Sequence, residues 1–327
     1  MKKIVIIGGG TGTFTLLSGL RKFPSDNSVV VSTADDGGST GRLRGELGVI
    51  PPGDIRQCLV GLSYTDETLR KLFSYRFAKG DLKGHTVGNI IIAALEKITG
   101  SVEQAIIQSA KMLNVRGQVV PVTLHPTRLS AIYNNGKKII GEHNIDEPKE
   151  NQNSKIKIQN LTLKPSGPAN PRAIRLISEA DVIVFGPGDL YTSTIPNLLV
   201  KGMVEAIKKS KAQKTLITNL MTKHGQTDRF KASDFVKHLE KYLGKGQINA
   251  VITNTKKPAA KWLTRHKKEH SEFVKPDIAG LKKTKVRVIA EPLLSSNTFE
   301  KNSSDILKRS FLRHDPEKLA KIIWQII

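Results

Sequence analysis

Glycine and threonine residues with phosphate-binding spacing cluster near the start of the chain, in the segment GGGTGT at 8–13. An apolar run, Ile4–Ile7, precedes this segment, and an amphipathic helical pattern follows it. Glycine lets backbone N–H groups approach an anion, and a helix N-terminus favours negative charge. The pattern therefore predicts a phosphate cradle made of Gly9, Gly10, Thr11, Gly12 and Thr13. The alternative is a tight strand–helix turn without a ligand.

A second polar loop, ADDGGSTGRLR at 34–44, follows a predicted strand at 29–33. Asp35 and Asp36 are candidate catalytic carboxylates, and together they could hold a ribose hydroxyl or a Mg²⁺ ion, which prefers oxygen ligands. Forked guanidinium donors suit phosphate. We therefore expect three more ligand-binding residues in this loop, namely Ser39, Arg42 and Arg44. The alternative is an Asp-Gly turn with ordinary surface arginines.

Two neighbouring motifs, PPGDIR at 51–56 and GHTVGN at 84–89, extend this candidate cleft. Asp54 is predicted to cap a helix at 55–62, with Arg56 in its first turn. His85 precedes the N-terminus of a helix predicted at 90–98, which would lower the pKa of its imidazole. It is either a catalytic or orienting group or a helix cap, and Asn89 is a candidate hydrogen-bond partner for a base or sugar.

Two further strands, predicted at 180–185 and 214–218, also end in polar loops, GPGDLYTST and NLMTKHGQT. Hydroxyl, amide and glycine groups again suit a phosphate or sugar. His224 has no second histidine or cysteine at zinc-ligand spacing, which argues against a zinc site. Arg313 stands just before the last predicted helix and could reach an anion. The candidate ligand-binding residues from the two loops are Gly186, Gly188, Asp189, Tyr191, Thr192, Asn219, Met221 and Thr222.

Repeated strand–loop–helix units must position these loops. In a parallel sheet the carboxyl ends of the strands meet at one edge, where ligands bind. We therefore predict an α/β chain with a three-layer αβα Rossmann-like fold, a mostly parallel sheet and one nucleotide-binding domain over residues 1–327. The turn NNGK at 134–137 indicates a hairpin, within a small antiparallel β extension at about 119–165 that includes a polar loop at 142–154. This extension is interpreted as structural rather than chemical.

The composition limits the classes of partner. A net charge of +23 over 327 residues favours anionic ligands. Nucleic acid is an unlikely partner, because aromatic residues make up only 5% and no recognised nucleic-acid motif is present. A single cysteine, Cys58, excludes an intrachain disulfide, and no apolar run approaches the length of a membrane span. We expect a cytoplasmic protein without membrane insertion, and a homodimer is a reasonable expectation.

Seven motifs in order resemble one family, the gluconeogenesis factors related to 2-phospho-L-lactate transferase. The motifs are GGGTGTFTLLSGL, TADDGGSTGRLR, PPGDIRQCL, GHTVGN, GPGDLYTSTIPNLLV, NLMTKHGQTD and RHDPEKLA. The resemblance implies a nucleotide diphosphate ligand at the strand ends. The bacterial branch, which these motifs resemble more closely, is associated with growth on gluconeogenic carbon and cell shape, and binds UDP-sugars. Gln226 and Asp189 replace the usual family glutamate and serine.

These observations lead to four candidate functions for the protein. The first is a nucleotide-sugar-binding regulator, for which no turnover is required. The second is a transferase that moves a phospholactyl group from a nucleotide-linked donor to a deazaflavin with Mg²⁺, with Asp35 or Asp36 on the metal side. A nucleic-acid-binding protein rests on net charge alone. A nicotinamide-dependent dehydrogenase is disfavoured, because threonine replaces the third glycine of the dinucleotide fingerprint.

Overall fold

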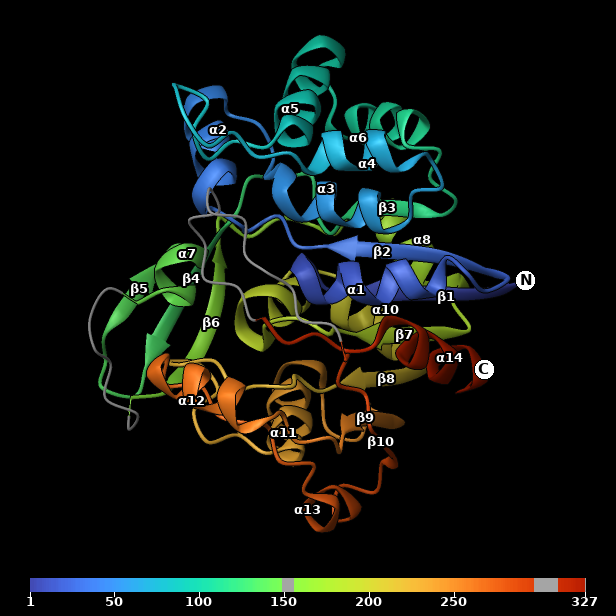
Figure 1. Ribbon diagram of the computed structural model, residues 1–327, viewed down its shortest axis with the longest axis vertical. Coiled ribbons are helices and arrows are strands. Elements are labelled where there is room, and N and C mark those ends of the chain that lie inside the picture. Colours follow the sequence, from blue (N-terminus) through green and yellow to red (C-terminus); the bar gives the residue numbers. More distant parts are fainter. Residues whose placement is uncertain (149–155, 297–310, 327) are drawn as a thin grey trace.

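A parallel sheet forms the centre of the molecule in the computed structural model, which describes residues 1–148, 156–296 and 311–326. Its strand order is β10-β9-β8-β7-β1-β2-β3, and every neighbouring pair is parallel (Figure 1). The strands are β1 (Lys2–Ile7), β2 (Ser25–Val31), β3 (Gln118–Pro121), β7 (Val182–Phe185), β8 (Gln213–Ile217), β9 (Ala250–Asn254) and β10 (Arg287–Glu291). The predicted α/β class and the mostly parallel sheet are confirmed.

The strand order reverses direction beside β1. The chain proceeds outward from β1 to β2 and β3, and then returns to place β7 on the other side of β1. A reversal of this kind leaves a crevice at the carboxyl ends of the two central strands, because the loops that follow them turn to opposite sides of the sheet. The polar loops after β1 and β7 are therefore neighbours at this crevice.

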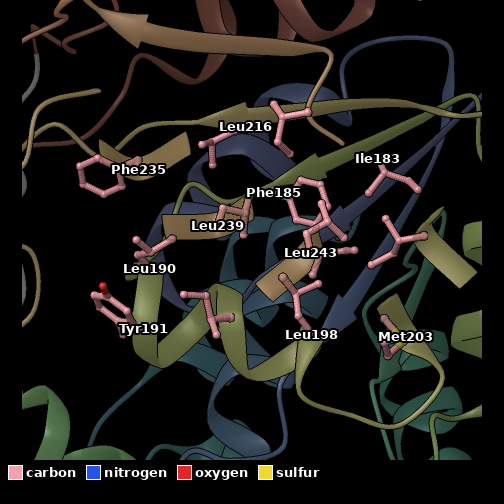
Figure 2. Packing of buried hydrophobic residues seen from close by; sticks show 14 of the residues in the cluster. Ile183, Phe185, Leu190, Tyr191, Leu198, Met203, Leu216, Phe235, Leu239 and Leu243 are labelled. Atoms are coloured by element: carbon pink, nitrogen blue, oxygen red, sulfur yellow. The ribbon is translucent and has the colours of Figure 1, made fainter. Parts of the chain in front are cut away.

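Alternating apolar residues in β1 explain why helices cover both faces of the sheet. Ile4 and Ile6 pack into one core and Val5 and Ile7 into the other, as the period of two in a strand requires. The first core holds residues of α1 (Gly10–Leu20), α3 (Pro52–Gly61), α4 (Glu67–Ser74), α5 (Val87–Thr99), α6 (Val102–Met112) and α14 (Pro316–Ile326). The second holds residues of α8 (Pro171–Glu179), η1 (Leu190–Thr194), α9 (Ile195–Leu198), α10 (Met203–Lys209), α11 (Ala232–Leu243) and α13 (Ile278–Lys282), and its packing is shown in Figure 2.

The predicted hairpin and antiparallel extension are present. A three-stranded sheet has the order β5-β4-β6, with a turn from Tyr133 to Gly136 joining its first two strands in sequence. The extension starts later than 119, because β3 pairs with β2 in the main sheet. Part of the polar loop predicted at 142–154 is helical, and residues 149–155 lie outside the described ranges. The elements are β4 (Arg128–Tyr133), β5 (Lys138–Ile140), α7 (Glu142–Asp146) and β6 (Ile158–Lys164).

One predicted helix boundary is wrong. Asp54 lies in the first turn of α3 instead of at the N-cap, because Pro52 begins that helix. After the loop that follows β7, the chain forms three short helical pieces, η1, α9 and α10, with Gly202 at φ +96° before the last piece. Two other helices, α2 (Gly38–Leu47) and α12 (Ala260–Lys268), border the crevice region. Within the described ranges, no helix has the length and apolar character to cross a membrane.

Candidate functional site

A polar cavity of about 650 Å³ lies at the carboxyl ends of β1, β2, β7 and β8. All four loops predicted to form the ligand site contribute to its lining, and so do α7, the end of α12 and the segment 312–314. Sixteen of the predicted residues line it: Gly9, Gly10, Thr11, Gly12, Asp35, Ser39, Asp54, Arg56, Asn89, Gly188, Asp189, Thr192, Asn219, Met221, Thr222 and Arg313.

Seven predicted residues do not line the cavity, namely Thr13, Asp36, Arg42, Arg44, His85, Gly186 and Tyr191. Two arginines instead hold backbone: Arg42 donates to the carbonyl of Lys83 and Arg44 to that of Thr127, both at 2.5 Å. Asp36 accepts from the backbone N–H of His143 at 2.9 Å and so fastens α7 to the loop after β2.

Buried neighbours account for two of the remaining residues outside the cavity. The hydroxyl of Thr13 donates to the carbonyl of Pro187 at 3.3 Å, which ties the loops after β1 and β7 together. The hydroxyl of Tyr191 lies 2.5 Å from Nδ1 of His238, and the Tyr191 ring belongs to the core in Figure 2. Both residues support the loops that line the cavity.

The glycine loop brings backbone and carboxylate into close contact at the start of α1. A Cβ on Gly12 would lie 2.3 Å from the carbonyl oxygen of Pro187, so the loop after β7 can pack there only against glycine. A Cβ on Gly9 would lie 2.0 Å from Oδ2 of Asp54, and Gly10 has φ +70°. The Asp54 carboxylate therefore sits at the positive end of the α1 dipole, beside the place predicted for a phosphate.

A hydrogen-bonded chain links His85 to the cavity. Nε of Arg56 donates to Oδ1 of Asn89 at 2.9 Å, and Nδ2 of Asn89 donates to Oγ of Ser39 at 3.1 Å. Oγ of Ser39 lies 3.0 Å from Nδ1 of His85. Burial, followed by the charge of Arg42, lowers the pKa of His85, so the predicted direction is confirmed with a different main cause. His85 is neutral at pH 7 and supports Ser39.

Carboxylates from separate elements face one another across the cavity. Glu142 of α7 has a pKa well above its usual value, because burial disfavours its charge and because Asp35, Asp146 and Asp54 lie near it. Of the two carboxylates predicted after β2, Asp35 lines the cavity, whereas Asp36 forms a hydrogen bond with the backbone of α7. No group of three or more histidine, cysteine, aspartate or glutamate residues in the described ranges is arranged to hold a metal ion. A Mg²⁺ ion bound partly by a ligand phosphate needs only one or two carboxylates.

Lys223, which the sequence interpretation did not single out, connects three elements at the cavity. Its Nζ lies 2.8 Å from Oδ2 of Asp146 and 3.4 Å from Oδ2 of Asp189. Asp146 also accepts from Thr192 and from Nε2 of Gln226, both at 3.1 Å. Burial opposes ionisation of Asp146, but Lys223 and these hydrogen bonds outweigh it and lower its pKa. The prediction that the antiparallel extension is structural rather than chemical therefore missed Glu142 and Asp146.

The fold and cavity define an α/β protein with a polar cleft at the reversal point of a parallel sheet. Residues 4–294 match the family model described as 2-phospho-L-lactate transferase CofD, and the chain belongs to that family. The gluconeogenesis factor of Bacillus subtilis is 39% identical over 326 residues, which cover 99% of this chain and 98% of the relative. The resemblance drawn from the seven motifs is thus confirmed.

Two further comparisons cover nearly the whole chain. A protein of Thermotoga maritima that carries the gluconeogenesis-factor name is 44% identical over 325 residues, 99% of each chain. A crystal structure of a Bacillus halodurans protein matches with a TM-score of 0.90 at 37% identity and covers 99% of both chains. The fold described above is therefore shared along the full length of a solved relative.

Proposed function

We propose that the cavity binds the diphosphate of a nucleotide-linked ligand. Among such ligands we favour a nucleotide sugar such as a UDP-sugar. The chain would then act in the cytoplasm as a gluconeogenesis factor that also supports cell shape, through binding alone. The observation that carries the proposal is the glycine loop of β1 and α1, which opens into a cavity of about 650 Å³ at the reversal point of the sheet. Such a crevice is where parallel α/β sheets bind nucleotides.

The charges of the lining support a phosphate ligand accompanied by a cation. Arg56 is only 6% exposed and is held by Asn89, and Arg313 also lines the cavity. These guanidinium groups suit phosphate oxygens. The nearby carboxylates of Asp35 and Asp54 would repel phosphate unless a Mg²⁺ ion were bound between them, and carboxylate oxygens are the kind of ligand that this ion prefers. We therefore propose that Mg²⁺ binds together with the nucleotide and that Asp36 does not coordinate the ion directly.

Calorimetric titration tests this function directly. The full chain is titrated with UDP-glucose and with pyrophosphate, each with and without Mg²⁺. We expect saturable binding of both ligands, strengthened about tenfold or more by Mg²⁺, because the ion neutralises repulsion between phosphates and carboxylates. No heat of binding at millimolar UDP-glucose, GDP or pyrophosphate would overturn the proposal. Replacement of Asp81 by asparagine serves as the matched control, since this carboxylate is exposed and does not line the cavity.

A phospholactate-type transferase is the second candidate, and the family model together with Glu142 favours it. The raised pKa of Glu142 leaves a protonatable carboxyl group in the cleft, which is the property required of a general acid or base. Incubation with a nucleotide-linked phospholactate donor, a deazaflavin acceptor and Mg²⁺ would then give a phospholactyl-deazaflavin. Loss of that product in Asp35→Asn but not in the exposed control Asp81→Asn is the expected pattern. Absence of turnover with wild-type protein that binds the donor would leave the binding function alone.

A further inference from the structure

We propose that one end of the cavity, formed by Leu220, Met221, Leu312, His266 and His314, is a nucleobase subsite. We call these five residues the β8 wall, because the first two lie in the loop that follows β8. The proposal rests on the proposed function, since it locates one part of the nucleotide within the same cavity. It specifies a planar heterocycle with an N–H donor as the group bound there.

The β8 wall presents an apolar surface inside an otherwise polar cavity. Leu220, Met221 and Leu312 belong, with Leu294, to a small cluster separate from the two main cores, and these three line the cavity. Trp262 of α12 stacks on Phe311 with ring centroids 6.3 Å apart, which holds α12 against the segment that carries the wall. A phosphate gains nothing from apolar side chains, whereas the faces of a nucleobase do.

Two buried ring nitrogens at this wall have no protein partner. Nε2 of His266 and Nε2 of His314 make no hydrogen bond within the described ranges, although the residues are 2% and 5% exposed. Both residues line the cavity. Buried polar atoms almost always have a partner, so each exception needs an explanation. A hydrogen-bonding ligand edge placed against the wall supplies that explanation.

The protonation state of His314 indicates which kind of ligand group can form a hydrogen bond with its ring. Burial lowers the pKa of His314 to about 4, so the ring is neutral at pH 7. A hydrogen bond to the backbone of Thr218 engages its other nitrogen and favours the proton there. Nε2 is then an acceptor, as one nitrogen of a neutral imidazole must be. His266 is also neutral, because burial lowers its pKa, and its Nδ1 lies 3.7 Å from Glu269. An N–H group of a nucleobase is a matching donor for Nε2 of His314.

The position of the wall in the sheet fits an extended nucleotide. Thr218 follows β8, and β8 is separated from β1 by β7 alone. Two strand spacings amount to roughly 10 Å, a span of the same order as that from a diphosphate to its base. In dinucleotide-binding folds the acidic residue after the second strand holds the ribose, which places the base on that side of the sheet. Here that position is Asp35, which lies near Glu142, and these carboxylates offer charge but no apolar surface for a base.

Calorimetry on the full chain with Mg²⁺ separates base recognition from phosphate binding. Pyrophosphate, UDP, CDP, ADP and GDP are the probes. His314→Asn keeps an amide near the Nδ1 position and removes Nε2, whereas His314→Gln restores a polar group near Nε2. The control is His125→Asn, because His125 is exposed and does not line the cavity. Thermal melting establishes that each variant is folded.

We expect wild type to bind at least one nucleoside diphosphate about tenfold more tightly than pyrophosphate, as one well-made base contact would give. His314→Asn should remove that preference and leave pyrophosphate affinity within about twofold of wild type. His314→Gln should recover part of the preference. Equal weakening of pyrophosphate and nucleotide, or no preference in wild type, would overturn the subsite. Failure of wild type to bind any of the five probes would contradict the proposed function itself.

Discussion

Lys223 carries one positive charge between two carboxylates, and it cannot neutralise both. Asp146 has the shorter contact, 2.8 Å against 3.4 Å, and also accepts from Thr192 and Gln226. Its pKa is lowered, whereas burial raises the pKa of Asp189. Asp189 and Gln226, the two residues that the motif resemblance marked as departures, therefore both contact the Lys223–Asp146 pair: Asp189 lies beside Lys223, and the Gln226 amide donates to Asp146. A glutamate at position 226 would instead add a further carboxylate beside Asp146.

Replacing Asp146 and Asp189 separately should have unequal effects on stability. We expect Asp146→Asn to lower the free energy of unfolding at pH 7 by about 1–3 kcal/mol, because Lys223 loses its nearer partner. Asp189→Asn should change it by less than about 0.5 kcal/mol or raise it, because a carboxylate with a raised pKa is poorly stabilised when charged. Urea unfolding at pH 7 measures both. Equal losses in the two variants would contradict this asymmetry.

The pH dependence follows from the direction of each shift. Asp146 has a lowered folded pKa, so its contribution is present above the unfolded value of about 3.9 and disappears as the pH falls through the folded pKa. Asp189 has a raised folded pKa, so wild type loses stability as the pH rises from about 3.9 through that folded pKa. The deficit of Asp146→Asn should therefore shrink in acid, and so should any gain of Asp189→Asn.

At the scale of elements, the start of α1 depends on close packing against the loop after β7. Gly12→Ala places a Cβ 2.3 Å from the carbonyl oxygen of Pro187, so one of the two loops must move. We expect a loss of about 1–3 kcal/mol in stability and a loss of pyrophosphate binding. Gly45→Ala on α2 is the control, because nothing lies within 4 Å of a Cβ there. It should stabilise the chain by roughly 0.5–1 kcal/mol. Calorimetry and thermal melting measure both, and unchanged binding in Gly12→Ala would contradict the proposed position of the diphosphate.

Elements with strong local signals could be predicted from the sequence, and elements placed by distant contacts could not. Runs such as Ile4–Ile7 followed by glycine correctly indicated strand, loop and helix, because those signals lie within a few residues. The contribution of α7 could not be read locally, because a hydrogen bond from His143 to Asp36, 107 positions away, brings it to the cavity. His266 and His314 likewise carry no spacing signal, because one lies on α12 and the other just before α14, and only the folded chain places both at the cavity.

The cavity as a whole requires nearly the full chain, because its lining extends from Gly9 to His314. The last part reaches the cavity through two anchors. Backbone hydrogen bonds pair Ser295 with Arg313 at 3.0 Å and Asp315 with Leu293 at 2.6 Å, which fixes the segment beside the end of β10. Immediately after it, α14 packs on α1, the helix that carries the glycine loop. One helix–helix contact thus relates the phosphate end of the cavity to the β8 wall.

Gly19 allows that contact and gives a test of the whole arrangement. A Cβ at Gly19 would lie 2.0 Å from the carbonyl oxygen of Pro316, the first residue of α14. Gly19→Ala should push α14 away from α1 and lower stability by about 1–3 kcal/mol. Because Arg313 and His314 directly precede α14, the variant should weaken binding of both ligands. The loss for a nucleoside diphosphate should be about threefold or more greater than the loss for pyrophosphate, because only the nucleotide also loses its contact with His314.

Calorimetry with both ligands, on protein shown to be folded by circular dichroism, measures this difference, with Gly45→Ala again as the control. Equal affinities in Gly19→Ala and wild type would mean that the backbone pairing with β10 is sufficient to hold the segment. Equal losses for both ligands would mean that the displacement affects only phosphate contacts, at Arg313 or at the glycine loop. A larger loss for the nucleotide is expected only if the two ends of the cavity bind different parts of one ligand and α14 positions the end that binds the base.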